Sequence, residues 1–262
     1  MKQWEDAALL LVGHGSSRVK TSRQATARLA EAIRQRSLFA EVQECFWREP
    51  PFLSLDLVTA STVFVVPNFS GEGLFTGQLI PQKLGLTGAC TGRSGRRIIY
   101  ARPVGAHPAL AAMLKSRAEG LCAAQDVSPA ATALLVVGHG SSRPEGSSVT
   151  PERVAATIRD TGHFAEVATA FIEQAPRVAD WRRLIAAPNV VVAPLLISEG
   201  MHARNDLPPL FGLAAATSGG PSLIDGRRVW LMGGIGQDAQ VIEMILDQVR
   251  AAEAAAEKEE RR

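Results

Sequence analysis

The sequence has little cysteine: Cys45, Cys90 and Cys122 lie far apart and form no Cys-x-x-Cys pair. This spacing argues against an iron–sulfur cluster and against a structural zinc site, because both need clustered thiolates. Scattered cysteines are typical of proteins in a reducing compartment. We therefore expect a cytoplasmic protein.

Aromatic residues and net charge are also scarce. Aromatic side chains make up 5% of the 262 residues, and the formal net charge is only +2. A nucleic-acid-binding surface needs a stronger basic excess and more stacking platforms, so we expect no nucleic-acid partner. No apolar run reaches the roughly 20 residues that span a bilayer, and the first ten residues lack a signal-peptide layout, so we expect no membrane association.

The sequence does contain a repeated motif. Residues 9–18, LLLVGHGSSR, return at residues 134–143 as LLVVGHGSSR, with nine of the ten positions identical. Each copy is an apolar run that ends at Gly-His-Gly, which is typical of a buried strand in a parallel sheet. Glycines after the run permit a tight turn and close approach to the backbone. The histidine therefore falls at the carboxyl end of a strand, where open α/β sheets bind ligands.

Strand and helix patterns recur around both copies, so we predict an α/β fold with two tandem duplicated domains, residues 1–127 and 128–262. Each domain is expected to have a four-stranded parallel sheet covered by helices on both faces. A pseudo-two-fold axis and a cleft are expected between the domains. The glycine-rich segments 87–96 and 214–225 are expected to be loops. The predicted strands are residues 7–12, 40–47, 61–67 and 97–100, then 133–137, 164–171, 190–196 and 228–232.

The helices are expected to fill the segments between these strands. Thr150-Pro151-Glu152 is typical of a helix start, with the hydroxyl of Thr150 as the cap. The predicted helices are residues 21–36, 50–58, 73–84 and 108–124, then those starting at 150, 176, 200 and 237.

Three possible metal ligands follow strands of the second domain. His139 ends its first strand, Glu173 follows the second, and His202 follows the third. Neighbouring parallel strands end about 5 Å apart, so these side chains can converge on one ligand. Two neutral imidazoles and a carboxylate, with open coordination positions, suit a transiently bound divalent metal. We predict a metal site at His139 and His202, with Glu173 assisting.

The first domain lacks this set of ligands. His14 matches His139, but Arg48 stands where the second domain has Glu173. Aligning residues 71–81 with 198–208 places Phe75 opposite His202. A guanidinium and a phenyl ring supply no metal ligand, so the first domain is predicted to have a degenerate site.

These motifs resemble the CbiX-type sirohydrochlorin chelatases, a family of class II tetrapyrrole chelatases, in their two-domain form. The resemblance rests on strand–GHGSS, on Phe-Ile-Glu with a following Pro, and on Glu-Gly-x-His-x-x-x-Asp-Leu-Pro at residues 199–208. It implies ATP-independent insertion of Co²⁺ or Fe²⁺ into sirohydrochlorin during cobalamin or sirohaem biosynthesis, a lyase reaction. It also implies that the metal is a substrate and that no cofactor is tightly bound. His139 and His202 would bind metal and act as bases, and Glu173 would assist.

The resemblance also implies a tetrapyrrole substrate rich in carboxylates. Ser141 and Ser142, with the amides of a helix start, would form a seat for a carboxylate. Arg143 and Arg204 would form ion pairs with other carboxylates of the substrate, and His14 would line the expected cleft between the domains. An internal pair of domains removes the need for a partner chain, so we expect a monomer, with a dimer left open.

Two other functions remain open at this point. A non-catalytic carrier of tetrapyrrole or metal would use the same fold, although the intact second-domain trio favours an enzyme. A nucleotide-binding α/β protein would use GHGSS as a phosphate loop, but the chain has no GxGxxG or GxxxxGK[ST] motif.

Overall fold

The computed structural model describes residues 4–17, 22–141, 146–197, 207–213 and 220–261. The chain divides into two compact units, the first made of Met1–His107 with Gly236–Arg262 and the second of Pro108–Ile235. Each unit contains a five-stranded sheet with helices packed on it. The predicted pair of α/β domains is therefore confirmed, with one more strand in each.

The sheet of the first unit has the strand order β2-β1-β3-β5-β4. The predicted parallel strands are β1, β2, β3 and β5, whereas β4 is an antiparallel edge strand inside the expected loop 87–96. Ser94 and Gly95 have φ angles of 51° and 75° between β4 and β5, as in the two-residue hairpins that suit the strand twist. The strands are β1 (Trp4–Gly13), β2 (Phe39–Phe46), β3 (Thr62–Pro67), β4 (Cys90–Arg93) and β5 (Arg96–Tyr100).

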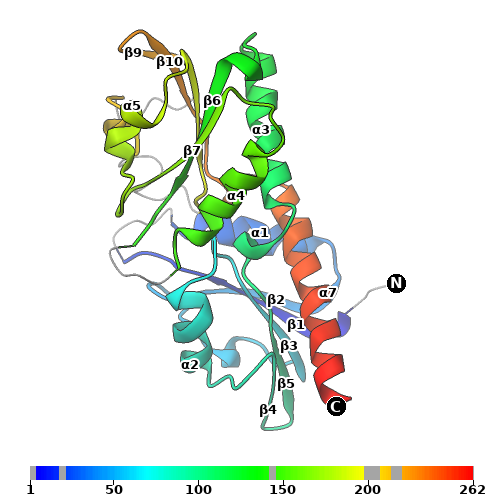
Figure 1. Cartoon of the computed structure of the whole chain (residues 1–262). Helices are drawn as coiled ribbons and strands as arrows, with labels where there is room; N and C mark the ends of the chain where they lie inside the picture. Colours follow the sequence, from blue (N-terminus) through cyan, green and yellow to red (C-terminus); the bar gives the residue numbers. More distant parts are fainter. Residues whose placement is uncertain (1–3, 18–21, 142–145, 198–206, 214–219, 262) are drawn as a thin grey trace. The chain divides into compact units, whose positions relative to one another are not determined.

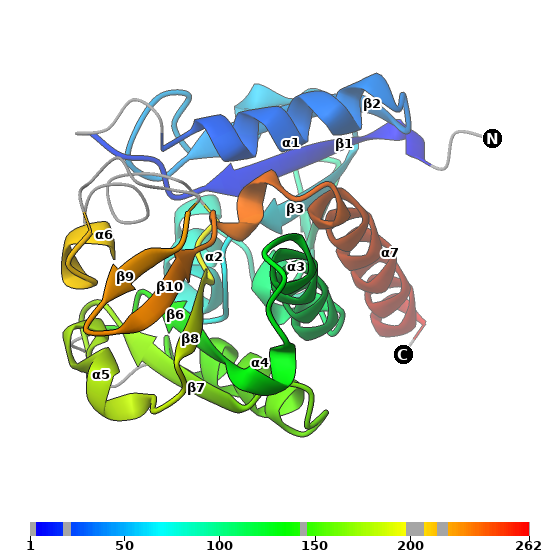
Figure 2. The same cartoon turned by 90° about the horizontal axis from the view of Figure 1, so that it is seen from above.

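Helices cover both faces of this sheet. On one face, Leu10 and Val65 are buried together with Ile80 of α2. On the other, α1 packs along β1 and β2 with Leu29 and Ile33 buried, and α7 packs on β3 and β5 (Figure 2). Full burial of each such aliphatic side chain stabilises the fold by about 1.5–3 kcal/mol. The helices are α1 (Gln24–Gln35), α2 (Ile80–Leu84) and α7 (Gln240–Glu260).

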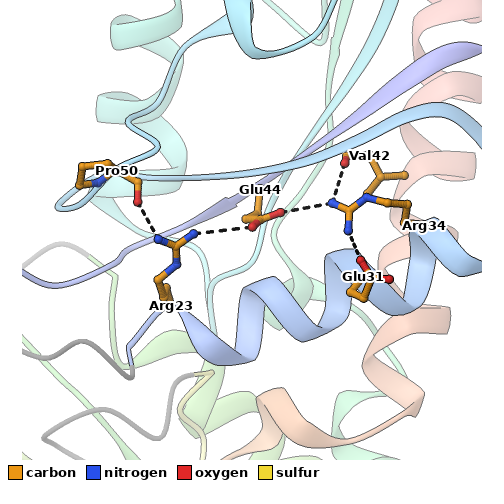
Figure 3. A network of polar contacts seen from close by, with 6 residues as sticks. All are labelled: Arg23, Glu31, Arg34, Val42, Glu44 and Pro50. Atoms are coloured by element: carbon orange, nitrogen blue, oxygen red, sulfur yellow. Dashed lines mark hydrogen bonds and ion pairs between the residues drawn. The ribbon is translucent and has the colours of Figure 1, made fainter.

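A polar network ties α1 to β2 and to the loop after it (Figure 3). The carboxylate of Glu44 lies 3.7 Å from Nη2 of Arg23 and 3.5 Å from Nη2 of Arg34. Arg23 also donates to the carbonyl oxygen of Pro50 at 3.1 Å, and Arg34 to that of Val42 at 2.9 Å. The network therefore fixes the start of the loop at the carboxyl end of β2.

The sheet of the second unit repeats this plan, with the order β7-β6-β8-β10-β9. Four strands are parallel, as predicted, and β9 is an antiparallel edge strand inside the expected loop 214–225. Asp225 and Gly226, with φ angles of 49° and 78°, make the hairpin turn. The strands are β6 (Thr132–Gly138), β7 (Glu166–Phe171), β8 (Asn189–Pro194), β9 (Ser222–Ile224) and β10 (Arg227–Leu231).

The second sheet is also covered on both faces. Trp181 and Phe211 are fully buried against Leu135 and Val192 on the face covered by α5 and α6. The other face is covered by α3 and α4, which pack side by side (Figure 1). The helices are α3 (Leu110–Ala124), α4 (Val149–Arg159), α5 (Trp181–Leu184) and α6 (Leu207–Leu210).

The start of α4 differs from the prediction. The helix begins at Val149, two residues before the predicted first helical residue Pro151, so Thr150 lies inside the first turn, 4% exposed, and is not the cap. Pro151 is buried as well, because this turn faces Gly138 at the end of β6: a Cβ on Gly138 would come within 2.7 Å of Cγ of Pro151. The first turn of the helix thus packs closely on the motif glycine.

The compact units do not coincide with the predicted ranges 1–127 and 128–262, because the helix that closes each repeat packs in the other unit. In the first unit, Gln248 of α7 donates to the carbonyl oxygen of Pro103 at 3.0 Å. In the second unit, Trp230 of β10 donates to Oε1 of Gln125, next to α3, at 3.2 Å. Among the described residues, no helix combines the length and the apolar character needed to cross a bilayer.

Candidate metal site

The second unit brings two of the predicted site residues together. His139 follows β6 and Glu173 lies two residues after β7. Because β7 and β8 flank β6, the carboxyl ends of the three strands named in the prediction are adjacent. His202, the predicted third member, lies outside the described residues, as do Ser142, Arg143 and Arg204. Within the described residues, no three His, Cys, Asp or Glu side chains form a group that could hold a metal ion.

The ring of His139 is oriented through its Nδ1 atom. This atom lies 3.2 Å from the carbonyl oxygen of Gly140 and 3.7 Å from Oε2 of Glu173. Both neighbours are hydrogen-bond acceptors, so they favour the tautomer with the proton on Nδ1. The lone pair of Nε2 is then the one offered to a metal or a proton. The His139 side chain is 37% exposed, so a ligand can reach the ring.

The backbone holds the two segments together. The amides of Ile172 and Glu173 both donate to the carbonyl oxygen of His139, at 3.1 and 2.9 Å. Gly140 has a φ angle of 76°, and a Cβ there would lie 2.9 Å from Cβ of Phe171 and 2.8 Å from Cγ of Gln174. Only glycine avoids both the strained φ and these contacts, which explains the Gly-His-Gly pattern.

Gln174 is a residue that the sequence prediction missed. Its Oε1 accepts hydrogen bonds from the amide of Ser141 at 2.8 Å and from Oγ of Ser147 at 3.3 Å. The amide of Ser141 is thus engaged within the protein, and the proposed role of Ser141 in substrate binding rests on its side chain. The sequence did contain a signal for this residue. Ser22 and Glu49 follow His14 at the same sequence separations as Ser147 and Gln174 follow His139.

The first unit surrounds its histidine differently. Nδ1 of His14 lies 2.9 Å from the carbonyl oxygen of Gly15, which repeats the geometry of His139. The His14 ring then packs edge-on against Phe75, with ring centroids 4.9 Å apart, where the repeats align Phe75 with His202. Trp47 and Phe69 pack on Phe75 at centroid distances of 5.6 and 6.0 Å. The end of this sheet is therefore an aromatic cluster rather than a set of metal ligands.

The three cysteines lie in different elements, β2, β4 and α3, and the pKa of each thiol is raised. Burial raises the pKa of Cys45 to about 12, and burial also raises the pKa of Cys122. The pKa of Cys90 is raised first by burial and then by its hydrogen bond to Glu260. The donor atoms of the proposed pair, His139 and Glu173, are nitrogen and oxygen, which hold Co²⁺ or Fe²⁺ less firmly than thiolates do.

Fold and site together define a class: a duplicated α/β protein in which one repeat pairs an imidazole with a carboxylate at the ligand-binding edge of its sheet. The chain belongs to the CbiX family, whose model matches residues 8–121 and 133–252.

Relatives and solved structures agree with this membership. A Halobacterium salinarum protein described as "probable sirohydrochlorin cobaltochelatase" is 32% identical over 95% of this chain and 92% of its own. A multi-domain Deinococcus radiodurans protein with structural similarity to chelatases superposes with a TM-score of 0.75 at 31% identity, over 92% of this chain and 54% of that one. The structure of CbiX, the terminal enzyme of siroheme biosynthesis in denitrifying bacteria, superposes with a TM-score of 0.69 at 27% identity, over 94% of this chain and 99% of that one.

Proposed function

We propose that this protein inserts a divalent metal, Co²⁺ or Fe²⁺, into sirohydrochlorin without ATP. The observation that carries the proposal is the pair of His139 and Glu173, 3.7 Å apart at the ends of β6 and β7. The Halobacterium salinarum relative, described as a probable sirohydrochlorin cobaltochelatase, supports sirohydrochlorin as the substrate, and the similarity to CbiX of siroheme biosynthesis supports a tetrapyrrole. The metal is a substrate in this proposal, and no cofactor is held between turnovers.

Metal insertion requires the loss of two pyrrole protons, and a neutral imidazole can accept one of them. Nε2 of His139 accepts it after its lone pair has released the ion to the pyrrole nitrogens, because Nδ1 faces the two acceptors described above. The carboxylate of Glu173 then stabilises the imidazolium that forms and can relay its proton to solvent, to which it is 50% exposed. His202 is proposed as the second metal ligand and base.

The remaining predicted site residues are proposed to bind the substrate, most of them through its carboxylates. Ser141, Ser142, Arg143 and Arg204 are proposed to bind them by hydrogen bonds and ion pairs. His14, in the aromatic surroundings of the first unit, is proposed to contact the substrate and not the metal. We propose that the chain works as a monomer in the cytoplasm.

The test is an absorption assay with purified protein, sirohydrochlorin and either Co²⁺ or anaerobic Fe²⁺. We expect metal insertion faster than the spontaneous reaction, and a loss of about 100-fold or more in His139→Ala, since general base catalysis contributes factors of this size. His14→Ala should lose less. If the protein binds sirohydrochlorin but does not accelerate the insertion of either metal, it is a carrier and not an enzyme.

A further inference from the structure

The segment after β7 is held to the Gly-His-Gly turn by the backbone hydrogen bonds to His139 and, in addition, by the side chain of Gln174, which acts as a clamp. Oε1 of Gln174 accepts from the amide of Ser141 at 2.8 Å and from Oγ of Ser147 at 3.3 Å. Gln174 directly follows Glu173, and Ser141 comes two residues after His139. The clamp therefore joins the two chain segments that supply the imidazole and the carboxylate.

The first unit contains the same clamp with a different residue. Oε1 of Glu49 accepts from the amide of Ser16 at 3.0 Å and from Oγ of Ser22 at 2.8 Å. Glu49 follows Arg48, which is no metal ligand, so here the clamp joins segments that hold no metal-binding pair. A side-chain oxygen at this position thus serves the fold in both repeats, whether it belongs to a carboxylate or to an amide.

We propose that Gln174 is a positioning residue for metal binding, because its amide oxygen keeps His139 and Glu173 at the separation that orients Nε2 of His139 toward the ion. This inference rests on the proposed function. Glu173 lies 3.7 Å from Nδ1, just beyond hydrogen-bond length, so a small displacement of the 172–174 segment changes whether it can orient the ring. Outer partners of this kind typically change metal affinity 10- to 100-fold when they are removed.

The first unit supplies the matched control. Gln174→Ala and Glu49→Ala remove the same pair of hydrogen bonds, one in the repeat that carries the proposed metal ligands and one in the repeat that lacks them. Gln174→Glu restores the acceptor oxygen, because Glu49 shows that a carboxylate makes both bonds. The probe is Co²⁺ alone with the full chain: its affinity is measured by titration, its visible spectrum reports coordination, and thermal unfolding of each variant reports stability.

We expect Gln174→Ala to weaken Co²⁺ binding about 10-fold or more and to alter the spectrum. Glu49→Ala should lose comparable stability and keep wild-type Co²⁺ affinity, and Gln174→Glu should regain most of the lost affinity. Wild-type affinity in Gln174→Ala would overturn the inference and leave the proposed function standing. Equal loss in Glu49→Ala, or no rescue by Gln174→Glu, would also overturn it. Absence of Co²⁺ binding by the wild type would overturn the proposed metal site itself, and the inference with it.

Discussion

His14 and His139 occupy the same position in two copies of one motif, and the motif holds both rings in the same way. In each, Nδ1 faces the carbonyl oxygen of the next glycine, at 2.9 and 3.2 Å. What differs is the surroundings: His14 packs on Phe75, whereas His139 lies beside Glu173. The chemistry at this position is therefore set by residues contributed from the neighbouring strands, not by the motif.

Gly140 offers a test of how tightly the turn is built. Alanine at Gly162, which has a φ angle of 65° and open space around it, should cost about 1–2 kcal/mol of unfolding free energy from backbone strain alone. Alanine at Gly140 adds contacts under 3 Å with Gln174 and Phe171, so Gly140→Ala should cost about 1–3 kcal/mol more.

Urea unfolding of the two variants measures this difference, and Co²⁺ titration should show weaker binding in Gly140→Ala only. Equal destabilisation by both substitutions would mean that the turn has room to relax.

The sequence predicts this turn well, since glycines at the end of a strand indicate a tight turn with positive φ angles. Gln174 was missed because its role depends on how closely the segment after β7 approaches the turn, which is a tertiary property. Glutamine after Phe-Ile-Glu has no local signature. The comparison of the two repeats, with Ser22 and Glu49 in matching places, is the one sequence feature that could have pointed to it.

Among the elements, β2 and β7 each use a glutamate to fix the segment that enters the next parallel strand. The carboxylate of Glu41 accepts from the amides of Thr59 and Ala60 at 3.0 and 2.8 Å, ahead of β3. Glu166 accepts in the same way from the amide of Ala187 at 2.7 Å, ahead of β8. These bonds set where β3 and β8, the central strands of the two sheets, begin.

This arrangement gives the stability a dependence on pH. Burial alone raises the pKa of Glu41, but the hydrogen bonds from Thr59 and Ala60 outweigh it and bring the pKa below the ordinary 4.5. A lowered pKa in the folded state means that Glu41 stabilises the fold above pH 4.5 and that this contribution is lost as the pH falls below it.

Glu41→Gln should therefore cost about 1 kcal/mol near neutral pH, as expected for partly exposed hydrogen bonds to a charged group. The difference in unfolding free energy between Glu41→Gln and the wild type should decrease as the pH falls below 4.5. Urea unfolding across this range measures it. A difference that stays constant with pH would show that the charge of Glu41 does not matter.

The sequence pattern predicts the parallel strands better than the edges of the sheets. Buried strands such as β3 and β8 are apolar runs, whose limits are marked by polar residues and turns. The antiparallel edge strands β4 and β9 are short and lie in segments that contain several glycines, so the pattern predicted loops there. Ser94-Gly95 and Asp225-Gly226 are nevertheless hairpin turn signals. The start of α4 was misplaced because the threonine cap pattern is local and does not show the packing of the first turn on Gly138.

For the molecule as a whole, a repeated sequence does not give two units made of contiguous chain. The helices that close the repeats, α3 and α7, each belong to the compact unit of the other repeat. There Gln125, next to α3, accepts a hydrogen bond from Trp230, and Gln248 of α7 donates one to Pro103. Periodicity identifies such helices but does not say which sheet they cover, because the spacing of apolar residues does not identify the packing partner. The repeat boundary and the boundary of the compact units are therefore different properties of this chain.

We propose that the two repeats differ in function, with metal bound by the second repeat and not by the first. The most direct measurement is the number of Co²⁺ ions bound per chain at equilibrium, for wild type, His139→Ala and His14→Ala. We predict about one ion for the wild type and for His14→Ala, and none for His139→Ala, because one imidazole carries an essential share of so small a donor set. Two ions in the wild type, or loss of the ion in His14→Ala, would contradict the account.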